Sequence, residues 1–253
     1  MSGHSKWSTI KHKKAAKDAR RGKQWAKLIR QIEVAARGAG TADVESSPSL
    51  ALAVQKAKDA EVPKDTIERA CKRGAGELEG AAAYEPAQYE GYAPGGIAVL
   101  VDVLTDNRNR TAADVRSAFT KAGGSLAEPG SVAFQFTRRG RVVLGKDGVD
   151  EDEVMLVGLD AGMEDLESDP DTYTAWCDPS DAADLRSALE GAGFKVQESG
   201  STMVPATTVP IAEVGEARKV LRLLDDLDDN DDVQDVYANF DIPDELIDEL
   251  EDA

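Results

Sequence analysis

The apolar residues of this chain change their spacing near residue 78, and this change limits the fold more than any other feature of the sequence. Before it they recur at helical spacing, and residues 11–37 are predicted to form a helix that could divide in two at Gly22. Ser47, which is followed by a proline, predicts the N-terminal cap of a second helix. A third helix is expected over residues 63–74, so residues 1–78 should form a helical domain.

Beyond residue 78, strands and helices are predicted to alternate. The apolar run at residues 97–104 predicts a central strand, and Thr111 is predicted to cap a helix that ends at two glycines after residue 122. Alternating side chains predict a strand over residues 132–136, a turn at 138–140 and a further strand at 142–144.

The same alternation returns in the second half of the chain. Helices are predicted at residues 154–161, 185–189, 217–227 and 244–252, and strands at residues 173–177, 194–196 and 233–240. Short units of this kind indicate an α+β protein built from split βαβ, ferredoxin-like modules. The length of 253 residues suits two such modules beside the helical domain.

Charge is divided unevenly along the chain. Residues 1–40 hold 11 Lys and Arg and two acids, which gives them a local charge of +9. The whole chain carries a net charge of −18, so the remaining residues carry −27. A basic arm on an acidic body indicates a polyanionic partner, and nucleic acid is the leading class. The acidic residues 225–232 lack the glycine and glutamate of a calcium loop and are predicted to form a solvated surface.

Other classes of function find little support in the sequence. No run of about 18 apolar residues occurs and the start lacks a signal-peptide pattern, so we expect no membrane span and a cytoplasmic location. Cys71 and Cys177 are far apart and are expected to be buried and reduced. With only His4 and His12 and no nucleotide-binding or zinc motif, we expect no catalytic residue, metal, cofactor or small-molecule substrate.

The basic arm is the first candidate site. Lysine and arginine neutralise phosphates, and aromatic rings stack on unpaired bases. The candidate residues are Lys6, Trp7, Lys11, His12, Lys13, Lys14, Lys17, Arg20, Arg21, Lys23, Lys27 and Arg30. For Trp7 alone, packing in the core is the favoured alternative. For the cluster as a whole, binding is favoured, because like charges at this density repel one another without a partner.

Arg108 and Arg110 form a second candidate site, between the end of a predicted strand and the start of a predicted helix. Helix N-termini favour anions, so two arginines at this point suit a phosphate clamp. The alternative has equal weight: one of the arginines pairs with a nearby carboxylate. The nearby carboxylates are those of Asp102, Asp106 and Asp114.

Four segments together resemble the YebC family. They are M-S-G-H-S-K-W at residues 1–7, the lysines of residues 11–14, E-G-Y at residues 90–92 with P-G-G at 94–96, and L-T-D-N-R-N-R-T at residues 104–111. That family is known for probable transcriptional regulators and includes the mitochondrial translational activator of cytochrome oxidase subunit one. The resemblance implies a helical domain, a middle α/β domain of residues 79–137 and 207–253, and a third domain of residues 138–206 inserted into it.

The resemblance also implies a function, a DNA-binding regulator of transcription. The residues themselves carry no helix-turn-helix or zinc-finger signature, and the basic ridge suits folded RNA equally well. A ribosome-associated translation factor that binds rRNA or tRNA therefore stays as the alternative. A protein–protein adaptor would leave the basic arm unexplained.

Overall fold

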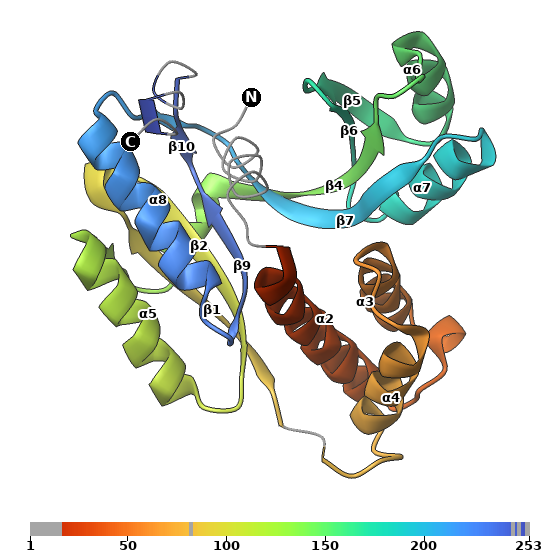
Figure 1. The fold of residues 1–253 in the computed structure, drawn as a ribbon, viewed down its shortest axis with the longest axis horizontal. Helices are drawn as coiled ribbons and strands as arrows, with labels where there is room; N and C mark the ends of the chain where they lie inside the picture. The colour runs from red at the N-terminus through yellow and green to blue at the C-terminus, as the bar shows by residue number, and fades with distance from the viewer. Residues whose placement is uncertain (1–16, 81–82, 244–245, 247–248, 251–253) are drawn as a thin grey trace.

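The computed structural model describes residues 17–80, 83–243, 246, 249 and 250 of the chain. The described residues form three bodies (Figure 1). They are a group of helices, a sheet with two long helices on one face, and a second sheet with two helices of its own. Helices and largely antiparallel sheets follow one another in the chain, which makes this an α+β protein and confirms the predicted fold class.

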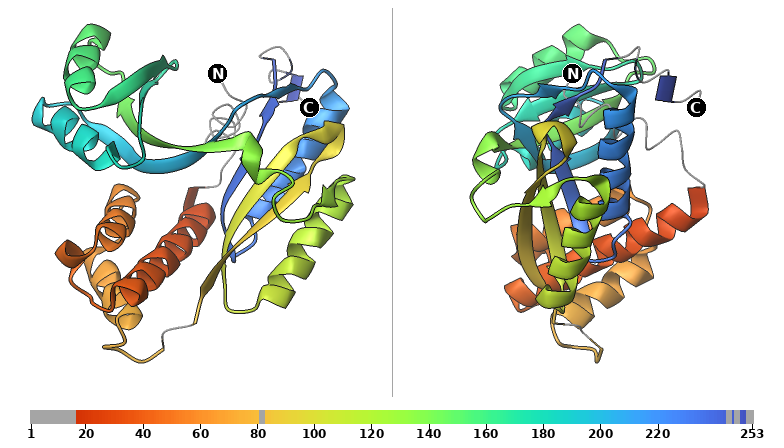
Figure 2. Two further views of the ribbon diagram at one scale, coloured as in Figure 1. Left: turned by 180° about the vertical axis from the view of Figure 1, so that it is seen from behind. Right: turned by 90° about the vertical axis from the view of Figure 1, so that its left-hand side faces the viewer.

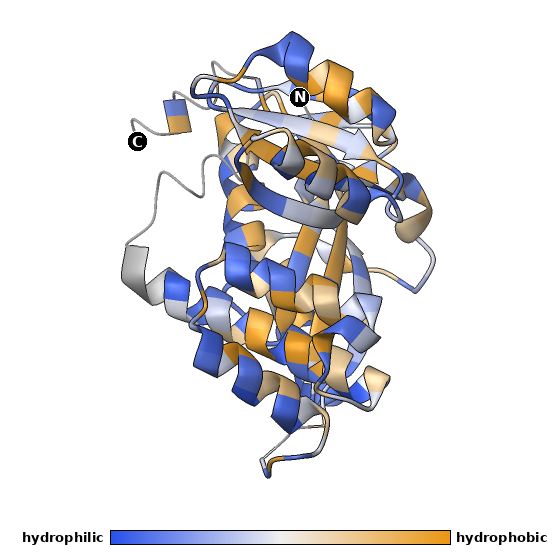
Figure 3. Cartoon of the chain, turned by 90° about the vertical axis from the view of Figure 1, so that its right-hand side faces the viewer, coloured by the Kyte–Doolittle hydropathy of each residue, from blue (hydrophilic) through white to orange (hydrophobic). Residues whose placement is uncertain are grey.

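Within the described residues, three α-helices form the first body. They are α2 (Lys17–Ala39), α3 (Pro48–Asp59) and α4 (Lys64–Gly74). Ser47 caps α3 as predicted, because its hydroxyl accepts a hydrogen bond from the Leu50 backbone N–H at 3.4 Å. The helices carry bands of hydrophilic and hydrophobic residues (Figure 3), and the hydrophobic residues meet in a core that includes Ile32 and Ile67.

Two glycines of this body behave differently. Helix α2 continues through Gly22, so the helix does not divide there. One glycine in a helix costs about 1 kcal/mol, which the packing of the long helix outweighs. Gly74 ends α4 so close to α2 that a Cβ atom would lie 2.4 Å from the carbonyl oxygen of Glu33 and 2.7 Å from the Cβ of Ala36. Only a residue without a side chain allows the two helices to approach in this way.

The second body is a four-stranded antiparallel sheet in the order β3-β1-β2-β9. Its strands are β1 (Glu85–Tyr92), β2 (Ala98–Thr105), β3 (Ser125–Leu126) and β9 (Val233–Ala238). Helices α5 (Arg108–Ala122) and α8 (Val214–Asp228) cover one face (Figures 1 and 2) and bury Val101, Phe119 and Leu224 between helices and sheet. Strand β9 and helix α8 come from the C-terminal part of the chain. They complete a sheet whose first strand begins at residue 85.

The opposite face of this sheet is covered by the segment that leads to the third body. Leu100 of β2 and Tyr237 of β9 pack there against Val132 and Phe136. A short parallel pair, β8 (Val209–Pro210) and β10 (Phe240–Asp241), joins the returning chain to the end of the sheet.

The third body is a second four-stranded antiparallel sheet in the order β5-β6-β4-β7. Its elements are β4 (Phe136–Gly145), α6 (Glu151–Asp160), β5 (Met163–Ser168), β6 (Thr172–Cys177), α7 (Ala182–Gly191) and β7 (Val196–Pro205). The two helices lie on one face over a core that includes Val142, Leu144 and Leu185. This chain order and strand order are those of the ferredoxin-like, split βαβ arrangement.

Some local predictions are wrong. Thr111 does not cap a helix, because the side chain of Asn107 accepts the Arg110 backbone N–H at 3.1 Å and starts α5 one turn earlier. Residues 138–140 are not a turn: they lie inside β4, which pairs with β6 on one side and β7 on the other. Residues 133–135 form a 3-10 helix instead of a strand, and Phe134 is 77% exposed.

Candidate nucleic-acid interface

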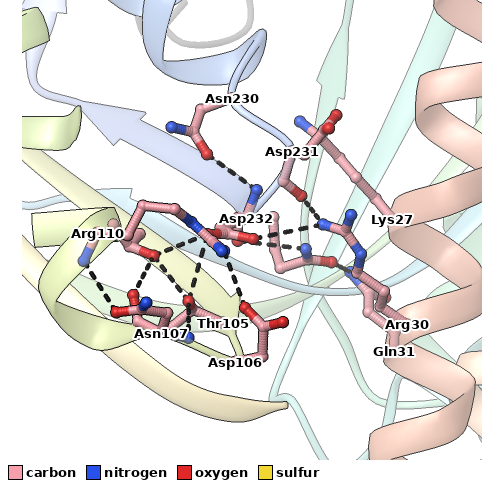
Figure 4. A network of polar contacts seen from close by, with 12 residues as sticks. Lys27, Arg30, Gln31, Thr105, Asp106, Asn107, Arg110, Asn230, Asp231 and Asp232 are labelled. Carbon is pink, nitrogen blue, oxygen red and sulfur yellow. Dashed lines mark hydrogen bonds and ion pairs between the residues drawn. The ribbon is translucent and has the colours of Figure 1, made fainter. Parts of the chain in front are cut away.

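The bases in the middle of α2 project away from the core of their own domain. Trp25 and Ile32 pack with α3 and α4, whereas Lys23 reaches toward the end of α8. Lys27 and Arg30 likewise reach toward the end of α8 and the loop that leads into β9 (Figure 4). A helix of 3.6 residues per turn places positions 23, 27 and 30 on one side. These three residues are called the basic edge below.

The basic edge contacts residues 228–232, which are called the acidic loop below. Lys23 Nζ lies 2.9 Å from the Asp229 carboxylate. Lys27 Nζ donates hydrogen bonds to the carbonyl oxygen of Asp228 at 2.6 Å and to its carboxylate at 3.1 Å. Helix α8 has no basic residue in its own last turn, so Lys27 supplies the cation that the C-terminus of a helix favours.

Arg30 extends the contact to the far end of the acidic loop. Its guanidinium donates to the carbonyl oxygen of Asp231 and lies 3.8 Å from the Asp232 carboxylate. Next to it, Gln31 Nε2 donates to Gln234 Oε1 at 3.3 Å. The prediction of a solvated acidic surface is therefore wrong for Asp232, which is buried, and for Asp228, which is partly covered by Lys27, whereas Asp229 and Asp231 remain exposed.

The middle domain holds Asp232 in place. Its carboxylate accepts hydrogen bonds from the hydroxyls of Thr111 at 2.7 Å and Thr105 at 3.2 Å, and from the Arg110 guanidinium at 2.7 Å. Asn230 Oδ1 accepts the Asp232 backbone N–H at 2.9 Å. Burial opposes the charged form, but these hydrogen bonds outweigh it and hold the pKa of Asp232 below its ordinary value. Asp232 thus stays charged beside the basic edge.

The two arginines of the second candidate site lie in the first turn of α5. Arg110 Nη2 lies 2.9 Å from the Asp106 carboxylate in addition to its contact with Asp232. Arg108 lies 3.5 Å from the Glu85 carboxylate and donates to the carbonyl oxygen of Pro86 at 3.1 Å. Both side chains remain about half exposed or more, at 48% and 61%. The predicted partner Asp102 instead accepts a hydrogen bond from Gln88 at 2.7 Å.

The remaining candidate residues lie at or before the start of α2. Arg21 pairs with Glu61 at 2.8 Å, and its guanidinium lies over the Trp25 ring, 4.9 Å from the centroid. Lys17 and Arg20 are in the first turn of α2, and their side chains are not described. The candidates outside the described residues are Lys6, Trp7, Lys11, His12, Lys13 and Lys14.

A second contact fastens the helical domain to the inserted one. Arg186 of α7 donates to both carboxylate oxygens of Asp59, at the end of α3, at 2.6 and 2.9 Å. Arg186 also donates to Ser199 at 3.0 Å and Glu190 at 2.9 Å. Sequence reasoning found neither this pair nor the role of Thr105 and Thr111. The contiguous segment at residues 104–111 was the one signal that marked the two threonines.

The part of the chain that the structure describes holds neither a group of metal ligands nor an activated thiol. There, no group of three or more His, Cys, Asp or Glu residues lies together as metal ligands. Both cysteines are buried and free, as predicted. Burial raises the pKa of the Cys177 thiol to about 11, so it is not a nucleophile near neutral pH. No helix within the described ranges is long and apolar enough to cross a membrane.

Two family models match the chain. The TACO1/YebC protein N-terminal domain matches residues 5–77, and the TACO1/YebC second and third domain matches residues 84–240. Relatives named probable transcriptional regulatory protein are 54% identical in Thermobifida fusca over 98% of both chains, and 54% identical in Beutenbergia cavernae over 100% of both.

A solved structure matches most of the chain. The crystal structure of a conserved hypothetical protein from Aquifex aeolicus is 43% identical in sequence and has a TM-score of 0.81. The match covers 90% of this chain and 93% of that one. The arrangement of helices and sheets described above is therefore shared with that protein.

Proposed function

Because the chain belongs to the TACO1/YebC family, we propose that it is a non-enzymatic regulator of gene expression that binds nucleic acid with its helical N-terminal domain. The relatives that are named probable transcriptional regulatory proteins support a regulator. The observation that carries nucleic-acid binding is the separation of charge, +9 in residues 1–40 against −27 in the remainder.

The proposed contact surface is the arm from Lys6 to Arg21 together with the basic edge of α2. Lysines and arginines that neutralise phosphates release condensed counterions, and this release drives association at low salt. His12 is proposed to stack on unpaired bases, and Trp7 is a second candidate for stacking beside its favoured alternative of packing in the core. Arg108 and Arg110 keep exposed guanidinium surface beside the same end of the middle domain and are proposed as secondary phosphate contacts.

Several further assignments belong to the same proposal. We propose domain boundaries at residues 1–78, 79–137 with 207–253, and 138–206. A non-enzymatic role is supported by the two buried, protonated thiols and by a sequence with only two histidines. The two free cysteines also suit the cytoplasm, which is a reducing compartment.

Duplex DNA is the ligand that the names of the relatives favour. A ribosome-associated translation factor that binds rRNA or tRNA is the second candidate. It is supported by the lack of a helix-turn-helix or zinc-finger signature in the sequence, and by a basic ridge that suits folded RNA equally well.

One experiment separates these candidates. The protein is crosslinked to nucleic acid in growing cells, recovered, and the attached nucleic acid is sequenced. Enrichment of promoter DNA supports the transcriptional role, and enrichment of rRNA or tRNA supports the translational one. Recovery of no nucleic acid above the level of an uncrosslinked sample would overturn the proposal as a whole.

A matched pair of variants tests the surface. Lys13→Glu, Lys14→Glu and Lys17→Glu together should abolish association with nucleic acid and with ribosomes. The control carries the same change of charge at three exposed lysines outside the helical domain, Lys121, Lys195 and Lys219. If the control weakens binding as much as the arm variant, net charge and not the arm determines binding.

A further inference from the structure

We propose that the acidic loop occupies the nucleic-acid-binding side of α2 in the free protein, and that phosphates must displace it. The inference rests on the function proposed above and concerns the regulation of the same basic edge. In the free protein the acidic loop would act as an internal competitor that lowers affinity for any weak or nonspecific polyanion.

The basic edge is already occupied by oxygen atoms of the acidic loop. The Lys27 side chain is 13% exposed and the Arg30 side chain 18% exposed, and both are directed at the loop (Figure 4). Phosphate oxygens accept hydrogen bonds from the same ammonium and guanidinium groups. A phosphodiester chain and the acidic loop therefore cannot occupy Lys27 and Arg30 together.

The acidic loop is held in shape by its own domain and does not depend on α2. Asp232 is anchored by Thr105, Thr111 and Arg110, and Asn230 caps its backbone N–H. Because these partners belong to the middle domain, the loop presents a fixed row of oxygens. Release of the basic edge therefore needs the helical domain to move, and not the loop to unfold.

The contact between Lys23 and Asp229 is weak enough to be exchanged for a phosphate. Lys23 and Asp229 are 47% and 67% exposed, and ion pairs as exposed as this contribute little to stability and are screened by salt. If only the released form binds with all three bases, the apparent affinity is reduced by the fraction of molecules that are released. A change that destabilises the contact must then raise affinity.

Covalent closure of the contact gives the direct test. Gln31 and Gln234 are each replaced by Cys and joined by a short bis-maleimide, while Cys71 and Cys177 stay buried and unlabelled. Affinity for a duplex DNA of about 20 base pairs and for an RNA hairpin is measured across salt. Because closure keeps Lys23, Lys27 and Arg30 away from phosphates, the logarithm of affinity for duplex DNA should fall less steeply with the logarithm of salt, by about 2 to 3. An unchanged slope in the crosslinked protein would overturn the inference.

Charge variants test the opposite direction. Asp228→Asn, Asp229→Asn and Asp231→Asn together should raise affinity at least threefold more than Glu153→Gln, Asp160→Asn and Asp184→Asn. The control set removes the same charge from exposed positions of the inserted domain. Equal effects of the two sets would show a general charge effect and contradict the inference.

A third variant changes no charge at all. Thr111→Val removes a hydroxyl that holds Asp232 and should also raise affinity, with circular dichroism to confirm that the protein is folded. If it is folded and its affinity is unchanged, the anchoring of the loop has no part in regulation. If the uncrosslinked protein binds neither nucleic acid, the proposed function fails and this inference with it. If that protein binds and closure changes nothing, only this inference fails.

Discussion

The guanidinium of Arg186 and the carboxylate of Asp59 form a two-point hydrogen-bonded ion pair between the inserted domain and the helical domain. Both side chains are largely buried, at 13% and 11% exposed. Arg186 also offsets the unfavourable position of the Asp59 carboxylate at the C-terminus of α3, where a positive charge is favoured. The pair links α3 of the helical domain to α7 of the inserted domain.

Arg186→Met should therefore weaken the protein, because it leaves the Asp59 carboxylate without its partner. The expected loss is roughly 3 kcal/mol, near the lower end for a broken buried pair since both groups keep some access to water. Urea unfolding measures it. The double variant Arg186→Asp with Asp59→Arg exchanges the two charges and should recover part of the lost free energy of unfolding. If the double variant is no more stable than Arg186→Met, the two residues are not coupled.

Glu90 carries a pH dependence of stability. Its carboxylate is 6% exposed and accepts backbone N–H groups of Gly130 at 2.6 Å, Val132 at 2.5 Å and Ala133 at 2.8 Å. Burial opposes the charged form, but the three donors outweigh it and lower the pKa of Glu90 below its ordinary value. The stabilisation is therefore present above the unfolded pKa of about 4.3 and is lost as pH falls through the lower folded pKa.

Glu90→Gln should cost about 1 to 3 kcal/mol near pH 7, because an amide has one acceptor oxygen for three donors. Urea titrations of the native protein and the variant at several pH values test this. The gap between the two proteins should begin to narrow below the unfolded pKa of about 4.3 and should close as pH falls through the lower pKa of folded Glu90. A gap that does not change with pH would mean that the charge of Glu90 has no role in it.

Gly74 and Gly22 make a matched pair of substitutions. Gly74→Ala places a methyl group against the Glu33 carbonyl oxygen and should destabilise the protein by roughly 1 to 3 kcal/mol. Gly22→Ala has no atom within 4 Å of the new methyl group and should stabilise α2 by up to about 1 kcal/mol. Thermal unfolding of both variants checks the two signs, and a neutral Gly74→Ala would contradict the close approach of α4 to α2.

The two cysteines should react slowly in the folded protein. Cys71 and Cys177 are buried, and burial raises the pKa of both thiols, so little reactive thiolate is present at neutral pH. Titration with a disulfide reagent should therefore find two thiols quickly in denaturant and slowly without it. Rapid reaction of either thiol in the native protein would show that its site opens readily.

Local patterns in the sequence predicted the elements with strong signals. Ser47 caps α3 through its own side chain, and the apolar stripe of α8 around Val220 and Leu224 faces the sheet. The strands β1 and β5 were missed because neither carries an apolar run or a regular alternation of apolar and polar residues, and their pairing depends on neighbours elsewhere in the chain. The early start of α5 was missed because Thr111 offered a competing cap signal to Asn107.

The candidate site was only half visible in the sequence. The spacing of Lys23, Lys27 and Arg30 predicts a positive side of a helix, and that side exists. Its partners were not predictable, because Lys27 and Asp228 are 201 positions apart and no local pattern encodes such a contact. The sequence of an acidic cluster does not indicate which basic residues contact it. That contact depends on how the domains pack against one another.

The salt dependence of binding tests the central claim most directly. The affinity of the full chain for a duplex DNA and for an RNA hairpin is measured between about 50 and 200 mM salt. For about five phosphate contacts on duplex DNA, the logarithm of affinity should fall with the logarithm of salt at a slope of about −4 to −5. A flat response with both nucleic acids would contradict a basic domain that grips the phosphate backbone.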